Sequence, residues 1–184
     1  MSQQTADVSV RVAWPADAAA IAAVQVAAWR ATYDGVLPRE LLDGLPADEF
    51  AAHWEKSIAT PKEARQRVLV ALERASVRGF TTTAPSTDED ADPGRDGEIG
   101  ELVVDPTARG AGHGSRLLHA AIDTMRSDRF TRATTWLAST NDDLRGFLVS
   151  QGWAADGAFR ELDLDGDGAV TVKQVRLHTS LTDG

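Results

Sequence analysis

The sequence contains no cysteine, only one tyrosine and no long apolar segment. The absence of cysteine excludes disulfide bonds, thiolate metal sites, iron–sulfur clusters and a cysteine nucleophile. No run of residues approaches the roughly 18 consecutive apolar side chains that a membrane-spanning helix needs. The first ten residues, MSQQTADVSV, lack the basic region and apolar run of a secretory signal. We therefore expect a cytoplasmic protein with no membrane partner.

Basic residues are outnumbered by acidic ones. The 184 residues include 19 Lys and Arg against 28 Asp and Glu, which gives a formal net charge of −9. Because a broad nucleic-acid interface needs a basic face, we expect no nucleic-acid partner. The hydrophobic share of 42% is typical of a globular protein, and the length suits a single domain over 1–184 with its core at about 8–178.

Hydrophobic periodicity predicts a mixed α/β fold. Strands are expected over 8–14, 68–73, 77–83, 98–104, 133–138, 158–164 and 169–178. Helices are expected after Pro15, Pro38 and Pro46, after the glycine-rich segment 109–114, and after Asn141, which can cap a helix. An acidic loop rich in Pro and Gly occupies 85–97. Because a helix connects 98–104 to 133–138, these two strands are expected to run parallel.

Three glycines alternate in the segment 109–114, between a strand and an amphipathic helix. Glycines let the backbone bend with its N–H groups pointing inward, and a helix N-terminus adds unpaired donors and a partial positive charge. This pattern predicts a site for a phosphate or pyrophosphate group. The spacing fits neither the dinucleotide fingerprint G-x-G-x-x-G nor the nucleoside-triphosphate loop, which needs a lysine.

The same segment resembles the signature [RQ]-x-x-G-x-[GA] of the GNAT superfamily of acyl-CoA N-acyltransferases. Asn141 followed by FLVSQGW is similar to the second signature of that family, and Trp29, Arg30 and Tyr33 fit a common opening. The resemblance covers about residues 8–178. It implies a GNAT fold, in which a mixed, mostly antiparallel sheet has a parallel, splayed central strand pair and flanking helices.

The resemblance further implies an acyl-CoA-dependent N-acyltransferase that uses acetyl-CoA as co-substrate and no metal. The backbone amides expected to hold the pyrophosphate are those of Arg109, Gly110, Ala111, Gly112, His113 and Gly114. The residues expected along the pantetheine arm are Leu102, Val103, Val104 and Asn141. The Val104 N–H is the expected donor to the tetrahedral oxyanion. The implied acceptor is a small-molecule amine or a peptide N-terminus, and a homodimer stays open.

Direct attack by an amine calls for a proton acceptor. Glu98 and Glu101 lie on the strand beside the implied thioester, and regular alternation would point them to opposite faces, so that only one enters the cleft. We favour Glu101, and the alternative is that both are surface carboxylates.

A proton donor for the departing thiolate is harder to find. Many family members carry a tyrosine where this chain has Leu148, which cannot donate a proton. Tyr33 is the remaining catalytic candidate, and packing against Trp29 is its structural alternative. The missing tyrosine also supports a second hypothesis, a GNAT-like module that binds coenzyme A without catalysis.

Two further signals have simpler explanations. His113 lies inside the glycine segment, and its side chain is expected to point to solvent. Asp163, Asp165, Asp167 and Gly168 match the first positions of a calcium loop, but Gln174 stands where that loop needs a bidentate glutamate. A tight Asp/Gly hairpin turn explains the same residues.

Overall fold

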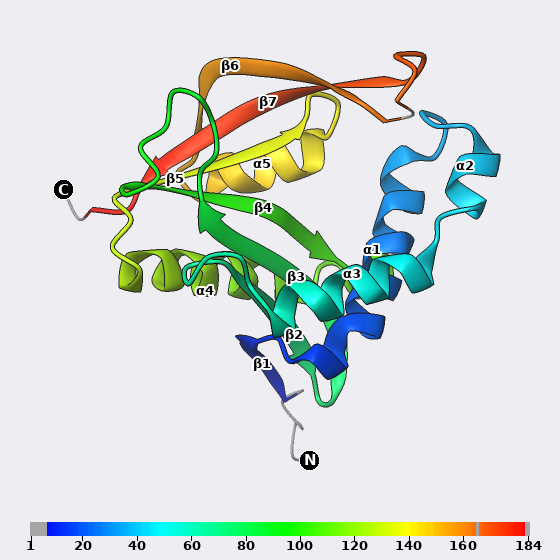
Figure 1. Cartoon of the computed structure of the whole chain (residues 1–184), viewed down its shortest axis with the longest axis horizontal. Coiled ribbons are helices and arrows are strands. Elements are labelled where there is room, and N and C mark those ends of the chain that lie inside the picture. The colour runs from blue at the N-terminus through cyan, green and yellow to red at the C-terminus, as the bar shows by residue number, and fades with distance from the viewer. Residues whose placement is uncertain (1–6, 165, 183–184) are drawn as a thin grey trace.

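The computed structural model describes residues 7–164 and 166–182, and these build a seven-stranded sheet with helices on both faces (Figure 1). The strand order is β1-β2-β3-β4-β5-β7-β6. The strands are β1 Val8–Val12, β2 Arg67–Glu73, β3 Ser76–Pro85, β4 Asp96–Val104, β5 Arg132–Ala138, β6 Ala154–Asp163 and β7 Thr171–Ser180. The α-helices are α1 Ala18–Tyr33, α2 Arg39–Asp43, α3 Ala47–Ala59, α4 His113–Ser127 and α5 Asp142–Ser150. Short 3-10 turns at Pro15–Asp17 and Pro106–Ala108 precede α1 and α4. Among the described residues, no helix is long and apolar enough to span a membrane.

The predicted parallel step is confirmed between β4 and β5, which α4 connects. The two strands pair only from Asp96↔Arg132 to Ile99↔Thr135. Beyond that point β4 continues along β3 to Val104, whereas β5 continues along β7 to Ala138. Figure 1 shows the two strands diverging from their common start. The sheet therefore has a V-shaped gap at its centre, as the GNAT resemblance implies.

Two apolar clusters hold helices against the sheet. On one face, Leu117 and Met125 of α4 and Leu148 of α5 pack with Ile99 and Leu177 of the sheet. On the other face, Ile21 of α1 and Trp54 of α3 pack with Val70 and Phe80. Apolar burial of this kind contributes roughly 25 cal/mol per Å² and is the main force that holds each layer in place.

Local side chains and glycines stabilise the ends of two helices. The Asn141 side chain accepts a hydrogen bond from the Leu144 N–H at 3.2 Å, which confirms its role as the cap of α5. The Asp17 carboxylate accepts from the Trp14 N–H at 2.7 Å, just before α1. Gly35 and Gly152 follow α1 and α5 with φ of +76° and +88°, values that glycine adopts without strain.

The acidic loop between β3 and β4 folds onto the sheet. Its anchor is Arg176 of β7, which is 5% exposed. The guanidinium donates to both carboxylate oxygens of Asp90, at 2.7 and 2.6 Å, to Asp88 at 3.0 Å and to Asp156 at 2.7 Å. The hydrogen bonds from Arg176 lower the pKa of Asp90 to about 2. The indole N–H of Trp136 also donates to Asp88, at 3.1 Å. Three carboxylates thus surround one buried cation.

We expect Arg176→Met to lower the free energy of unfolding by about 3 kcal/mol, because the substitution removes the shared cation from Asp88 and Asp156, which are both largely buried. Arg160→Met is the matched control: Arg160 lies on the neighbouring strand, is exposed and should cost less than about 1 kcal/mol. Urea denaturation at neutral pH measures both values. A loss below about 1 kcal/mol in Arg176→Met would show that the network does not stabilise the fold.

Candidate active site

A β-bulge interrupts β4 at the mouth of the central gap. Pairing with β3 is regular at Thr81↔Leu102 and at Thr83↔Ile99, so Gly100 and Glu101 together oppose the single residue Thr82. The Thr81 hydroxyl donates to the Glu101 carbonyl oxygen at 2.7 Å, and the Glu101 N–H donates to the Thr82 hydroxyl at 3.0 Å. A Cβ at Gly100 would lie 2.7 Å from that hydroxyl, so the bulge requires glycine there.

The bulge shifts the alternation of side chains along β4. Ile99 packs with α4, whereas Val103, four residues later, packs with α1 and α3 on the other face. In a regular strand both would share one face. The prediction that Glu98 and Glu101 point to opposite faces is therefore wrong, because the extra residue lies between them.

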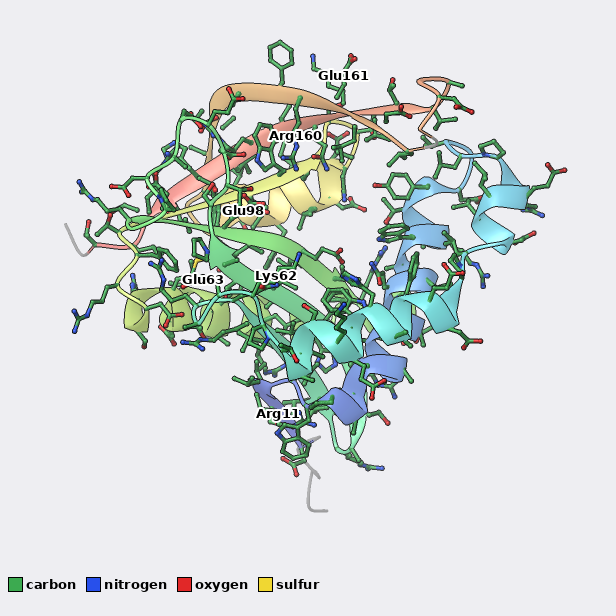
Figure 2. The ribbon with its side chains drawn as sticks, in the orientation of Figure 1. Arg11, Lys62, Glu63, Glu98, Arg160 and Glu161 are labelled. Carbon is green, nitrogen blue, oxygen red and sulfur yellow. The ribbon has the colours of Figure 1, made fainter. Side chains whose placement is uncertain are left out.

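Glu98 and Glu101 share the face that carries α1, but they have different neighbours. Burial, followed by the negative charge of Asp88, raises the pKa of Glu98, and the positive charges of Arg160 and Arg176 oppose that shift. Figure 2 shows Glu98 beside the acidic loop, and shows Arg160 and Glu161 on opposite sides of β6. Glu98 thus belongs to the surroundings of the Arg176 cluster.

Glu101 is largely buried and lies near α1. Burial raises its pKa from the ordinary 4.5 to about 7. Its Oε1 lies 3.5 Å from Nε2 of Gln25, and its Oε2 is buried with no hydrogen-bond partner among the described residues. A carboxyl group that titrates near neutral pH can accept a proton in a reaction at that pH.

Tyr33 lies at the last turn of α1 and is half-buried. Its ring meets Trp29 edge-on, with 6.4 Å between the ring centroids, as the packing alternative predicts. Burial and the negative charge of Glu101 both raise the pKa of the Tyr33 phenol. The electrostatic influence of Glu101 shows that these two catalytic candidates belong to one region of the molecule.

The glycine-rich segment forms the predicted turn into a helix. Gly110 and Gly112 have φ of +79° and +83°, a backbone conformation that other residues adopt only with strain. The first helical bond of α4 runs from the Arg116 N–H to the Gly112 carbonyl at 3.1 Å, so the preceding N–H groups are not tied into the helix. Arg109 is exposed, and the Arg116 guanidinium folds back to the Ala111 carbonyl at 3.0 Å. The turn thus has the backbone form of an anion site.

The prediction that the side chain of His113, the first residue of α4, points to solvent is wrong. Its side chain does not point to solvent: it is 1% exposed, and neither ring nitrogen has a hydrogen-bond partner among the described residues. Burial is the main cause that lowers its pKa. Its spacing of four and eight residues from Leu117 and Ala121, on the apolar stripe of the helix, is the signal that could have placed it correctly.

The backbone beyond the bulge offers hydrogen-bonding groups to the gap. The Asp105 N–H donates to the backbone carbonyl oxygen of Arg78 in β3 at 2.8 Å, and the pairing of β4 with β3 is regular from Leu102 to Val104. Since N–H groups alternate sides along a strand, those of Leu102 and Val104 point away from β3, toward the gap. Leu148 of α5 is 1% exposed and packs in the core between α4, α5 and the sheet.

The Asp/Gly segment before β7 forms a hairpin turn. The two carboxylate oxygens of Asp163 accept from the N–H groups of Gly166 and Gly168, at 2.9 and 3.0 Å. Asp165, one of the calcium-loop positions, lies outside the described residues. Among the described residues, no group of three or more His, Asp and Glu side chains is arranged to hold a metal ion.

Comparison with known proteins identifies the family of this chain. The model of the Acetyltransferase (GNAT) family matches residues 29–153. A curated relative, the uncharacterized N-acetyltransferase YuaI of Bacillus subtilis, is 29% identical over 138 residues, which are 74% of this chain and 75% of that protein.

Solved structures share the fold over nearly the whole chain. An N-acetyltransferase from Staphylococcus aureus has a TM-score of 0.72 at 18% identity and covers 96% of this chain and 99% of its own. The acetyltransferase yncA from Salmonella typhimurium, solved with acetyl-CoA, has a TM-score of 0.67 at 19% identity and covers 96% and 95%.

The raised pKa of Glu101 predicts a dependence of stability on pH. Between pH 4.5 and about 7 the folded state keeps a proton that the unfolded state has lost, so the free energy of unfolding falls as pH rises. We expect Glu101→Gln to be more stable than wild type by about 1–3 kcal/mol at pH 8, and equal to it below about pH 4.5. Urea denaturation at both pH values measures this, with the exposed Glu161→Gln as control. Equal stability at pH 8 would contradict the burial of an ionised Glu101.

Proposed function

Because the chain belongs to the GNAT family of acetyltransferases and is therefore an N-acetyltransferase, we propose that it transfers the acetyl group of acetyl-CoA directly to a primary amine, on a small molecule or a peptide N-terminus. The observation that carries this proposal is the position of Glu101. A buried carboxyl with a pKa near 7 lies on the bulged strand whose next residues border the gap. The same strand leads into the glycine turn.

The residues on either side of the gap fit acetyl-CoA. The N–H groups of 109–114 suit a pyrophosphate, because the left-handed glycines turn the chain just before the helix N-terminus and the first helical bond begins only at the Arg116 N–H. The backbone of Leu102 and Val104 can pair with the amides of the pantetheine arm as an added strand does. The side-chain oxygen of Asn141 accepts the hydrogen bond that caps α5. We propose that this residue also contacts the pantetheine arm. The co-substrate supplies an acetyl group activated as a thioester.

Two groups on β4 then act on the reacting atoms. A free alkyl amine has a pKa of about 10 and reaches the site mostly protonated, so a base must take its proton. Glu101 has the lower pKa, and it accepts that proton at or above neutral pH. The Val104 N–H donates to the acetyl carbonyl oxygen, where negative charge grows during attack.

Departure of the thiol needs no acid from the protein. An alkyl thiol has a pKa of about 8.5, so the thiolate can leave unprotonated and then receive, through water, the second proton that the nitrogen loses as the amide forms. Leu148 donates nothing, and its burial in the core fits that reading. Tyr33 stays protonated because its pKa is raised, which leaves it as the one side-chain candidate we consider for an acid.

The acidic loop is engaged within the protein. Arg176 binds both Asp88 and Asp90, so the charge of these two carboxylates is partly offset and their side chains are held by β7. We therefore do not base the choice of acceptor on this loop.

We expect acetyl-CoA to bind through the glycine turn and to be consumed with one or more amines in a broad acceptor panel. Gly112→Asp should weaken acetyl-CoA binding by about tenfold or more, since it sets a negative charge against the pyrophosphate. Gly152→Asp is the matched control, with the same charge, a similar left-handed φ and open space around it. Calorimetry on the folded variants measures both affinities.

Unchanged affinity in Gly112→Asp would mean that the turn does not bind the phosphates. Binding without turnover of any amine would favour the coenzyme A-binding module instead.

We expect kcat at saturating substrates to rise with pH, with a midpoint near 7, and then to reach a plateau, because Glu101 must be ionised. Tyr33→Phe should change kcat by less than about tenfold, whereas a required general acid contributes about 10²–10⁴-fold. Because the pKa of Tyr33 is raised above 10, its alkaline limb would lie beyond the usual range. The substitution is therefore the sharper measurement, and a larger loss in a folded variant would make Tyr33 the acid.

A further inference from the structure

A polar chain of three side chains crosses the apolar layer between the helices and β4. The indole N–H of Trp54 in α3 donates to Oε1 of Gln25 in α1 at 2.8 Å. Nε2 of the same amide lies 3.5 Å from Oε1 of Glu101 in β4. Gln25 and Trp54 are 6% and 7% exposed. A buried glutamine on a face shared with Ile21 and Val24 carries a desolvation cost unless both ends of its amide are satisfied.

The chemistry of the groups fixes the direction of this chain. An indole nitrogen can only donate, so the amide oxygen of Gln25 must face Trp54. The NH₂ end, which can only donate, is then left to face Glu101. Trp54 is itself held in place, because its ring meets Phe80 edge-on with 5.2 Å between the ring centroids. The amide is thus presented to Glu101 in one orientation.

We propose that Gln25 is a positioning residue for Glu101, held by Trp54 so that it donates to Oε1 when the carboxylate is ionised. The bond is long in the free protein, and we expect it to shorten when substrate is bound. With Oε1 engaged, the buried Oε2 is the oxygen that takes the proton of the amine. The inference rests on the proposed function in that Glu101 is the base.

The test compares Gln25→Met, which keeps the length of the side chain and removes the amide, with Trp54→Phe, which removes the indole donor and keeps a smaller aromatic ring. Trp153→Phe is the control, because Trp153 is an equally buried indole in the cluster on the other face of the sheet. Carbon-13 NMR of the side-chain carboxyl measures the pKa of Glu101 in the protein without acetyl-CoA. Tyr33 is the titratable neighbour whose charge state has to stay constant, which it does below pH 9.

Loss of a donor to the ionised form raises a carboxyl pKa. We expect the pKa of Glu101 to rise by about half a unit or more in Gln25→Met, and in the same direction in Trp54→Phe. Trp153→Phe should leave it unchanged. Because the two residues act in series, Trp54→Phe should add little in the Gln25→Met background. In Gln25→Met, kcat should fall about tenfold, whereas the KM for acetyl-CoA should stay within about twofold of wild type. The midpoint of the dependence of kcat on pH should move to higher pH.

An unchanged Glu101 pKa in both folded variants overturns the inference, as does a fully additive double variant. The proposed function fails separately, if Glu101→Gln keeps wild-type turnover while the NMR shift in Gln25→Met still occurs. Loss of turnover in Glu101→Gln, with no effect in Gln25→Met, would retain the base and reject its positioning residue.

Discussion

The structure of the site depends on one irregularity, the two-against-one pairing of Gly100 and Glu101 with Thr82. Two threonine hydroxyls bond the backbone of Glu101, and the absence of a Cβ at Gly100 lets β3 come close. This arrangement turns Glu101 toward α1 and Gln25. It also bends β4 where its ladder with β5 ends, so that one local feature both opens the gap and aims the carboxylate beside it.

Much of the fold could be predicted from local sequence. The glycine-rich segment before α4 and the asparagine before α5 act within a few residues, and the structure has a turn and a helix cap at these positions. The parallel pairing of β4 and β5 was predicted from the helix that connects them. These predictions succeed because the interactions that decide them are close in sequence.

The errors arise where contacts between distant residues decide. Whether Glu98 and Glu101 lie on the same face of the sheet depends on threonines of another strand, about 20 residues earlier. Regular alternation along β4 alone therefore predicts the wrong face for one of them. The acidic loop could be recognised from its composition, but not its binding to Arg176, which follows about 86 residues later. His113 is different, because its burial follows from local sequence: it lies four and eight residues before Leu117 and Ala121 on the apolar stripe of α4.

The short ladder between β4 and β5 divides the sheet into two half-sheets, β1 to β4 and β5 to β7, that share only a narrow backbone seam. Arg176 crosses from the second half to a loop that belongs to the first. Its side chain therefore connects the two half-sheets, on the same face of the sheet as Glu98 and Glu101. Because Arg176 and Asp88 are both largely buried, dissolved salt screens their ion pair weakly. This connection between the two half-sheets should therefore persist at ionic strengths that weaken surface ion pairs.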